Sequence, residues 1–442
     1  MKIALLTPYT GGNLGDAAIQ EAVISNIRRR HPNADICLIT LCPEVTAKLH
    51  GVPSFPITSF ALKNYSPGPL VRTRHGNDAN ASPTVTQGLL SRVKATTKKS
   101  SLLYSVLKRG YQTLAAVGRG ASLIREELLH FIRAYGLMKG VSLLLVSGGG
   151  QLDDFWGGPW GHPYALFKWG LIARAAGAKC VFLSVGTCSL ESRLSAFFIR
   201  LALRFAAYRS YRDQTSKRLL KHLAFTGNDA VYPDLAFSYA NVGSMHSPSS
   251  RKVERVVGVS PIAHLSQYYW PKKDLPVYEC YFKNLIEFIS DLIRQGYSIV
   301  LFSTGIPDRK VISDIVDKLA MDVTLDVTGR IHEPRTDTLN ELFAQLLNVD
   351  YVVASRLHGV LLSHLLCIPV LAISCDCKVD THMADMELSQ YCLDIHNCEK
   401  ASLAQALESL TANADFIKSR LKERCADYAR ALECQYDVVL GT

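Results

Sequence analysis

Short apolar segments alternate with longer amphipathic segments along almost the whole chain, and this alternation limits the range of folds strongly. The first repeat predicts a strand at Lys2–Tyr9, a glycine-rich turn at Thr10–Asp16, a helix at Ala17–Arg30 and a second strand at Asp35–Leu41. Two strands joined through a helix run parallel, because the helix returns the chain across the sheet. The sequence therefore predicts an α/β protein built on parallel sheets.

The length of 442 residues and a polar break in this pattern predict two domains. We expect a Rossmann-like, doubly wound domain at residues 1–240, a linker rich in Ser, Gly and Pro at 241–254, and a second such domain at 255–399. Two helices at residues 400–442 complete the chain. The strands expected in the second domain are Arg255–Ala263, Tyr297–Thr304, Asp322–Val327, Asp350–Ala354 and Pro369–Ser374.

The formal net charge of +10 comes from one segment. Residues 60–140 contain 13 Lys and Arg against 3 Asp and Glu, and the rest of the chain carries equal numbers of both. Such a segment suits contact with an anionic membrane or an acidic polymer, or it is a solvated insertion between core elements. Its scattered aromatic residues show no RNA-binding signature, so we expect no nucleic-acid partner.

The N-terminus leads straight into the first predicted strand, which leaves no room for a signal peptide, and no apolar run reaches the roughly 20 residues of a membrane-spanning helix. We therefore expect a cytoplasmic protein, soluble or peripheral to the inner face of the membrane. Among 12 cysteines, Cys37, Cys180, Cys367 and Cys375 lie in or beside apolar segments, which favours reduced thiols. The cysteines and histidines of residues 375–398 match no zinc spacing, so no metal site is predicted.

The segment Ser355-Arg356-Leu357-His358 sets a cation beside a titratable ring directly after a buried strand. Ligands bind at the carboxyl ends of strands in open parallel sheets, so Ser355, Arg356 and His358 are expected to face a crevice. Arginine binds carboxylate or phosphate, and histidine transfers protons near neutral pH. The same pattern fits a helix capped by Ser355, with Arg356 in a surface ion pair and His358 packed on its own helix.

The first turn, T-G-G-N-L-G-D, contains Gly12, Asn13, Gly15 and Asp16. Its glycines allow a tight bend or the close approach of a ligand, and it opens a helix whose N-terminal amides attract anions. It is not the dinucleotide-binding pattern G-x-G-x-x-G, however, and a plain turn capped by Asn13 or Asp16 fits equally well.

Two later segments also place polar residues after expected strands. The run S-G-G-G-Q-L-D-D exposes backbone at Gly149 and Gly150, and its Asp153 either meets sugar hydroxyls or caps a helix. Arg212-Asp213 either repeats the arrangement of a cation at a crevice or forms an ion pair within the protein.

Together and in this order, these segments resemble the polysaccharide pyruvyl transferase family. The resemblance runs through GGNLGD, SGGGQLDD, YRDQTS, YPDLAF, SRLHGVLLSHLLCIPVLAIS and CDCKV, and leaves out residues 60–140. Cys367 occupies a position where the family commonly has a glycine, and we expect this difference to affect packing more than catalysis. The resemblance implies two Rossmann-like domains that face a cleft, as in GT-B glycosyltransferases.

The resemblance further implies that phosphoenolpyruvate is the donor, that a sugar on the side of the first domain is the acceptor, and that the product is a pyruvate ketal. Carried over by motif, Arg356 and His358 of the second domain belong to the donor site, with Arg212 as a further donor contact; these three are the expected catalytic residues. Two arginines can hold the carboxylate and the phosphate, and a protonated His358 can protonate the methylene carbon. Asp16 and Asp153 are candidate bases, and no metal or other cofactor is expected to be required.

The expected acceptor belongs to a cell-envelope polysaccharide, such as an exopolysaccharide, or to its precursor, either free or lipid-linked. Two other functions stay open: a GT-B glycosyltransferase with a nucleotide-sugar donor, and a non-catalytic carbohydrate- or membrane-binding protein. The second of these has no use for a titratable group at the crevice. The expected substrate-binding residues are Gly12, Asn13, Gly15, Asp16, Gly149, Gly150, Asp153, Asp213, Ser355 and Leu357.

Overall fold

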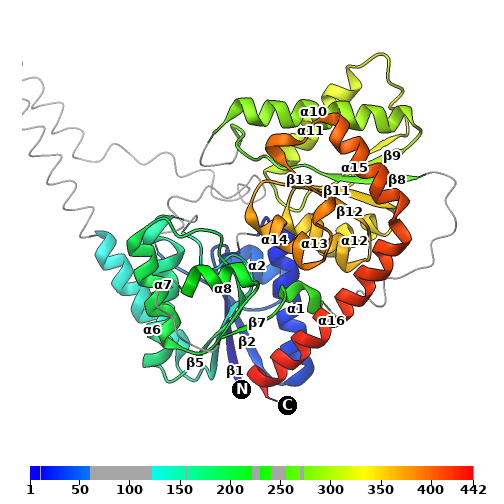
Figure 1. Cartoon of the computed structure of the whole chain (residues 1–442). Helices are drawn as coiled ribbons and strands as arrows, with labels where there is room; N and C mark the ends of the chain where they lie inside the picture. Colours follow the sequence, from blue (N-terminus) through cyan, green and yellow to red (C-terminus); the bar gives the residue numbers. More distant parts are fainter. Residues whose placement is uncertain are drawn as a thin grey trace, which may run out of the picture.

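The computed structural model describes residues 1–9, 11–59, 122–154, 157–221, 229–239, 255–268 and 273–441. The expected linker at 241–254 and most of the basic segment at 60–140 lie outside these residues. The described elements form two units, each built around one sheet (Figure 1).

The described part of the first unit contains a 7-stranded sheet in the order β3-β2-β1-β4-β5-β6-β7. All neighbouring strands run parallel, as the alternation predicts. The order 3-2-1-4-5-6 is that of Rossmann sheets, and ligands bind such sheets at the carboxyl ends of their strands. The strands are β1 (Lys2–Leu6), β2 (Asp35–Thr40), β3 (Ser54–Pro56), β4 (Leu143–Ser147), β5 (Lys179–Val185), β6 (Ala206–Tyr211) and β7 (Ala230–Val231).

Successive residues of these strands point to separate hydrophobic cores on the two faces of the sheet. Ile3 and Leu5 face the core that contains α1, whereas Ala4 and Leu6 face the core that contains α6 and α7. The helices and short 3-10 turns of this unit are α1 (Leu14–Arg30), α2 (Pro43–His50), a helix at residues 122–138, η2 (Gly158–Trp160), α6 (His162–Ala175), α7 (Arg193–Phe205), α8 (Gln214–Lys221) and η3 (Leu235–Ser238).

The second unit repeats this topology in a 6-stranded parallel sheet with the order β10-β9-β8-β11-β12-β13. The predicted fold class, two Rossmann-like α/β units, is confirmed. The strands are β8 (Val256–Ser260), β9 (Ser298–Leu301), β10 (Ile331–His332), β11 (Tyr351–Ala354), β12 (Val370–Ser374) and β13 (Cys392–Asp394). The helices of this unit are α10 (Leu275–Arg294), α11 (Asp308–Ala320), α12 (Leu339–Leu346), α13 (Leu357–Leu365), α14 (Cys377–Asp385) and α15 (Lys400–Ala412), and the last helix of the chain is α16 (Ala414–Leu440).

The strand expected at Asp322–Val327 is wrong, because these residues form turns and β10 follows them. The carboxylate of Asp322 accepts a hydrogen bond from Thr324 N at 3.0 Å, and that of Asp326 accepts one from Thr328 N at 3.0 Å. Aspartate side chains that bond to backbone two residues ahead favour turns over strands.

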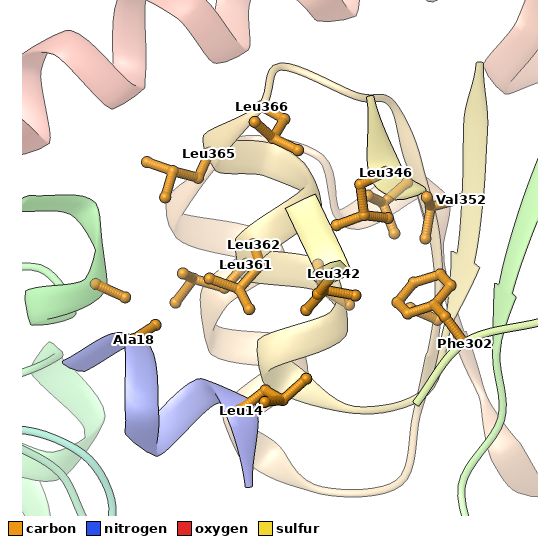
Figure 2. Packing of buried hydrophobic residues seen from close by; sticks show 14 of the residues in the cluster. Leu14, Ala18, Phe302, Leu342, Leu346, Val352, Leu361, Leu362, Leu365 and Leu366 are labelled. Carbon is orange, nitrogen blue, oxygen red and sulfur yellow. The ribbon is translucent and has the colours of Figure 1, made fainter. Parts of the chain in front are cut away.

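Helix α1 joins the two units. Leu14 and Ala18 of α1 lie against Leu361 of α13 and Leu342 of α12 in Figure 2, and all four belong to one apolar core that spans both units. Because α1 packs on its own sheet with one side and on the second unit with the other, it is buried over most of its surface. The start of α1 therefore has a fixed position relative to the second sheet.

Helix α16 follows the second unit in sequence but runs back along the first (Figure 1). Gln435 is completely buried, and it accepts a hydrogen bond from Ser184 Oγ at 3.2 Å and donates one to Ser210 Oγ. Arg30 of α1 donates to Asp437 Oδ1 at 3.0 Å. The last helix thus completes the surface of the first unit.

Candidate functional site

Helix α13 begins where β11 ends, as the sequence predicts. Arg356 occupies its N-cap position in extended conformation, so the chain turns from strand into helix at Ser355 and Arg356. His358, on the first turn, reaches the start of α1. A methyl group built on Gly15 would lie 1.9 Å from His358 Cγ, so the imidazole occupies the space that any side chain at Gly15 would need.

The environment of His358 favours its neutral form. Burial lowers the pKa of His358 below the usual 6.5, and the nearby carboxylates of Asp234 and Asp16 only partly oppose this effect. Conversely, burial raises the pKa of Asp16, and His358 partly opposes that effect. A carboxyl group with a raised pKa beside an imidazole with a lowered pKa is an arrangement suited to proton transfer near neutral pH.

Arg212 lies at the end of β6 and is almost fully buried. Its Nε is 3.5 Å from Asp213 Oδ2, and its Nη1 is 3.5 Å from Asp234 Oδ2. A methyl group on Gly186 would lie 2.9 Å from Arg212 Nη2, so a side chain at this position after β5 would displace the guanidinium. The predicted ion pair of Arg212 with Asp213 is present, and Asp234 is a second partner that the sequence did not indicate.

Arg356 pairs with a carboxylate of its own unit. Its guanidinium contacts Asp308 at the start of α11, with Nη2 3.0 Å from Oδ1. Asp308 is completely buried and also accepts a hydrogen bond from Ala263 N at 2.9 Å, after β8. This ion pair is therefore partly enclosed at the carboxyl ends of β8 and β11, whereas the alternative reading from the sequence placed it on the surface.

The glycine-rich first turn makes backbone contacts with the second unit. Leu14 N donates to Thr304 O at 2.8 Å, and Ile306 N donates to Gly12 O at 3.1 Å. The side-chain oxygen of Asn13 caps α1 by accepting from Gly15 N at 2.9 Å, which is the capping role that the sequence left open.

Asp153 forms a polar link between the units. Its carboxylate accepts hydrogen bonds at 2.8 Å from Thr187 Oγ1, Cys188 N and Lys378 Nζ, and Lys378 belongs to the second unit. Burial by itself would raise the pKa of Asp153, but Lys378 and these hydrogen bonds outweigh it and lower the pKa. Both carboxylate oxygens of Asp153 therefore already accept hydrogen bonds within the protein.

The other predicted binding residues lie around these groups. Gly149 adopts φ 70°, and a methyl group on Gly150 would be 3.2 Å from Lys378 Nζ. Asp213 accepts from Ser216 N at 2.6 Å, and the hydroxyl of Ser355 is buried 3.0 Å from the hydroxyl of Tyr281.

A narrow pocket opens between the two units. Its volume of about 30 Å³ holds about two water molecules, which is less space than a sugar occupies. Asp234, Lys378 and His382 were not singled out from the sequence, although Asp234 lies in YPDLAF and Lys378 in CDCKV. The lining residues are Arg212, Asp213, Pro233, Asp234, Phe237, Leu357, Leu361, Lys378, Thr381, His382, Asp385 and Tyr428.

A disulfide bond crosses from one unit to the other beside this pocket. It joins Cys188, after β5, to Cys377, the first residue of α14, with their Cα atoms 6.3 Å apart. The expectation of reduced thiols is wrong for this pair, although Cys37, Cys180 and the other cysteines are free. The two residues are 189 positions apart, and only the packing of the units shows that they meet.

Alkylation under denaturing conditions is expected to modify ten cysteines without reductant and all 12 after reduction. Cys188→Ser is expected to free Cys377, so that all 11 remaining cysteines are modified without reductant. Mass spectrometry is the measurement. Cys434→Ser, at an exposed free cysteine, is the matched control. Modification of all 12 cysteines in the unreduced protein would contradict the cross-link.

In the described part of the chain, no group of three or more His, Cys, Asp or Glu side chains is arranged to hold a metal ion. The same residues include no helix with the length and apolar character needed to cross a bilayer.

Comparison with known proteins identifies the family to which the chain belongs. Residues 13–376 match the sequence profile of a family described as "Polysaccharide pyruvyl transferase". The chain belongs to the polysaccharide pyruvyl transferase family. The matched range begins after β1 and includes the strands from β2 to β12, together with all the site residues discussed above except Gly12, Cys377, Lys378 and the positions after them.

Solved structures with similar folds include an epimerase and a glycosyltransferase. The UDP-GlcNAc 2-epimerase from Neisseria meningitidis, solved with UDP-GlcNAc, is 12% identical, with a TM-score of 0.55 and coverage of 100% of both chains. A glycosyltransferase from Rickettsia africae is 8% identical, with a TM-score of 0.53 and coverage of 99% of this chain and 98% of that one. At such identities the likeness shows the two-domain GT-B type of fold alone.

Proposed function

We propose that this family member transfers the pyruvyl group of phosphoenolpyruvate to a sugar of a polysaccharide or its precursor, forming a pyruvate ketal and releasing phosphate. The family supports pyruvyl transfer to polysaccharide. The structural observation that carries the proposal is the position of His358, which comes from the second unit but lies near Asp16 and Asp234 of the first. His358 Nε2 is an enclosed atom without a hydrogen-bond partner among the described residues, as expected where a reacting group binds, and Asp234 Oδ2 has the ion pair with Arg212 but no hydrogen bond.

In the proposed reaction, His358 protonates the methylene carbon of phosphoenolpyruvate, and two sugar hydroxyls attack C2 in turn while the bond from C2 to the phosphate oxygen breaks. One hydroxyl proton restores His358, and the other leaves with phosphate. The negative charges of the donor raise the pKa of a neighbouring imidazole and so oppose the effect of burial. We propose Asp16 as the base rather than Asp153, because Asp153 already accepts three hydrogen bonds.

Arg356 and Arg212 are proposed to hold the carboxylate and the phosphate of the donor. Each now pairs with aspartate, so donor binding would exchange one anionic partner for another. We propose no metal or other cofactor for this reaction.

The proposed location is the cytoplasm, with a lipid-linked acceptor at the inner face of the membrane. The basic excess of residues 60–140 supports contact with anionic lipid. The described end of that segment, the helix at residues 122–138, exposes Ile124, Leu128 and Ile132. Co-sedimentation with anionic vesicles that weakens as salt rises is the test.

Phosphate release from phosphoenolpyruvate with a panel of sugar acceptors tests the function. We expect acceptor-dependent release by the wild type, a loss of about 100-fold or more in kcat/KM in Arg356→Ala, and little change in Arg294→Ala, an exposed arginine of α10. No release with any acceptor, together with stabilisation by a nucleotide sugar in thermal unfolding, would favour the glycosyltransferase alternative.

A further inference from the structure

Helix α7 of the first unit carries apolar side chains on two opposite sides. Ile199, Ala202 and Leu203 on its inner side are buried in the core that also contains α6. Its outer side combines arginines with large apolar residues at helical spacing. These outer residues, all exposed or half-buried, are Arg193, Leu194, Phe197, Arg200, Leu201 and Arg204. Apolar surface of this kind marks a place where a partner binds.

An exposed tryptophan extends this surface. Trp160 of η2 is 60% exposed and Phe197 is 48% exposed, although both side chains are large and apolar. The ring centroid of buried Phe198 lies 5.5 Å from that of Trp160 and 5.9 Å from that of Phe197, so both exposed rings pack on the same buried one. We call Trp160 and the six outer residues of α7 the α7 face.

The charges of the α7 face are all positive. Neither α6 nor α7 contains Asp or Glu. Arg193, Arg200 and Arg204 have no ion pair among the described residues, and the enclosed Nε of Arg200 has no hydrogen-bond partner there. Guanidinium groups without a carboxylate partner are available to bind phosphate groups.

The surface of an anionic phospholipid bilayer matches this combination better than other partners do. Lipid phosphates pair with arginines, while apolar side chains enter the region between the headgroups and the acyl chains, where tryptophan is enriched. An acidic polymer would bind the arginines but offers no apolar phase to Phe197. A second copy of the chain would bring like charges together across a two-fold interface.

The α7 face lies at the edge of the first sheet that carries the candidate site. Both η2 and α7 follow the carboxyl ends of strands, those of β4 and β5. Asp154, next to Asp153 of the candidate site, accepts a hydrogen bond at 2.9 Å from the backbone N of Ser192, the N-cap of α7. The start of α7 is therefore fixed beside the turn that holds Asp153.

The helix at residues 122–138 belongs to the same layer. Figure 1 shows this helix, coloured cyan, beside α6 and α7 on one side of the first sheet. Tyr164 of α6 donates to Glu127 of this helix at 3.2 Å, and its ring centroid is 5.6 Å from that of Trp160. The apolar residues that this helix exposes are thus linked to the α7 face through one residue of α6.

We propose that the α7 face is a membrane-docking surface, that Trp160, Leu194 and Phe197 enter the interface of an anionic bilayer, and that the arginines of α7 bind lipid phosphates. The inference goes beyond the proposed function, because it holds for any reaction at the candidate site. It also adds to the proposed location a surface outside residues 60–140. Docking through this face brings the carboxyl edge of the first sheet to the bilayer, within reach of a lipid-linked sugar.

Co-sedimentation of the full chain with vesicles of phosphatidylglycerol and phosphatidylcholine tests the proposal. We expect Phe197→Ser to weaken vesicle partitioning about tenfold at low and at high salt, because it removes a large apolar side chain. Arg193→Gln should weaken it about fivefold at about 0.1 M salt and less at about 1 M, where exposed charges are screened. The controls, both on α16, are Phe416→Ser, at a phenylalanine that is 67% exposed, and Arg430→Gln.

Three results would overturn the docking surface. They are a wild type that does not bind these vesicles, a Phe197→Ser variant that binds them like the wild type, and self-association of the wild type without lipid that Phe197→Ser removes in analytical ultracentrifugation. The last result would make the α7 face an interface between copies.

Phosphate release with a water-soluble acceptor separates this proposal from the proposed function. We expect Phe197→Ser to keep wild-type release, because Phe197 contacts no residue assigned to the reaction. If the wild type binds vesicles through Phe197 but releases no phosphate with any acceptor, pyruvyl transfer fails and the docking surface stands. If release is normal and any of the three results above is found, the docking surface fails and pyruvyl transfer stands.

Discussion

Replacing His358 with Asn is expected to lower kcat by about 10²–10⁴-fold, the usual contribution of a positioned general acid. The smaller side chain fits the space beside Gly15, so the fold should be kept. Phosphate release at saturating donor and acceptor measures the effect, and far-UV circular dichroism checks folding. His332→Asn, on an exposed strand of the same unit, is the control. A folded His358→Asn variant with more than about a tenth of wild-type turnover would exclude this histidine as the essential acid.

The pH dependence of wild-type activity shows whether His358 acts as an acid or as a base. Because burial lowers the pKa of His358 below 6.5, the acidic form of the free enzyme is scarce at pH 7 and becomes common only below that pKa. We therefore expect kcat/KM for the donor to rise as pH falls from 8 towards the lowered pKa, by about tenfold per unit, and then to fall again as Asp16, the proposed base with a raised pKa, becomes protonated. This rise should be absent in His358→Asn. A profile that instead rises with pH would assign His358 the role of a base.

The second large effect is expected from Gly15→Ala. The added methyl group would lie 1.9 Å from His358 Cγ, so the imidazole must move or the units must separate. We expect a loss of about 1–3 kcal/mol in the free energy of unfolding, typical of an overpacked core, and a loss of activity comparable to that of His358→Asn. Denaturant unfolding and phosphate release are the two measurements.

Gly136→Ala is the matched control, because a methyl group on Gly136, in the helix at residues 122–138, meets no atom within 4 Å. There, alanine should add up to about 1 kcal/mol of stability through helix propensity and leave activity unchanged. If Gly15→Ala behaves like this control, the close contact between α1 and His358 does not exist in solution.

The sequence predicted the parallel sheets because buried parallel strands are continuous apolar runs, as at Leu143–Ser147. The missed strands β3, β10 and β13 are short and lie at sheet edges, where few apolar residues are needed. The false strand at Asp322–Val327 has apolar residues, but its aspartates bond locally and favour turns. Local side-chain bonding of this kind is not visible in an apolar pattern.

Part of the candidate site was predictable because the strands that position it were predictable. Arg356 and His358 follow a strand, and the carboxyl end of a parallel strand is a position that sequence pattern can find. The residues that contact them could not be predicted. Asp308 and Gly15 belong to other elements, and only the packing of those elements in the fold brings Asp308 close to Arg356 and Gly15 close to His358. The contact of His364 Nδ1 with His382 Nε2, 3.1 Å apart, likewise joins two helices, and no local sequence pattern indicates it.

The path of α16 has a consequence for exchanging parts between relatives. Glu433, Gln435 and Asp437 bond to Arg30, Ser184 and Ser210 of the first unit, although they follow the second unit in the chain. A chimaera that took residues 255–442 from another family member would pair a foreign helix with those groups and leave buried Gln435 partners unsatisfied. A functional chimaera would have to inherit its last helix from the same parent as its first sheet.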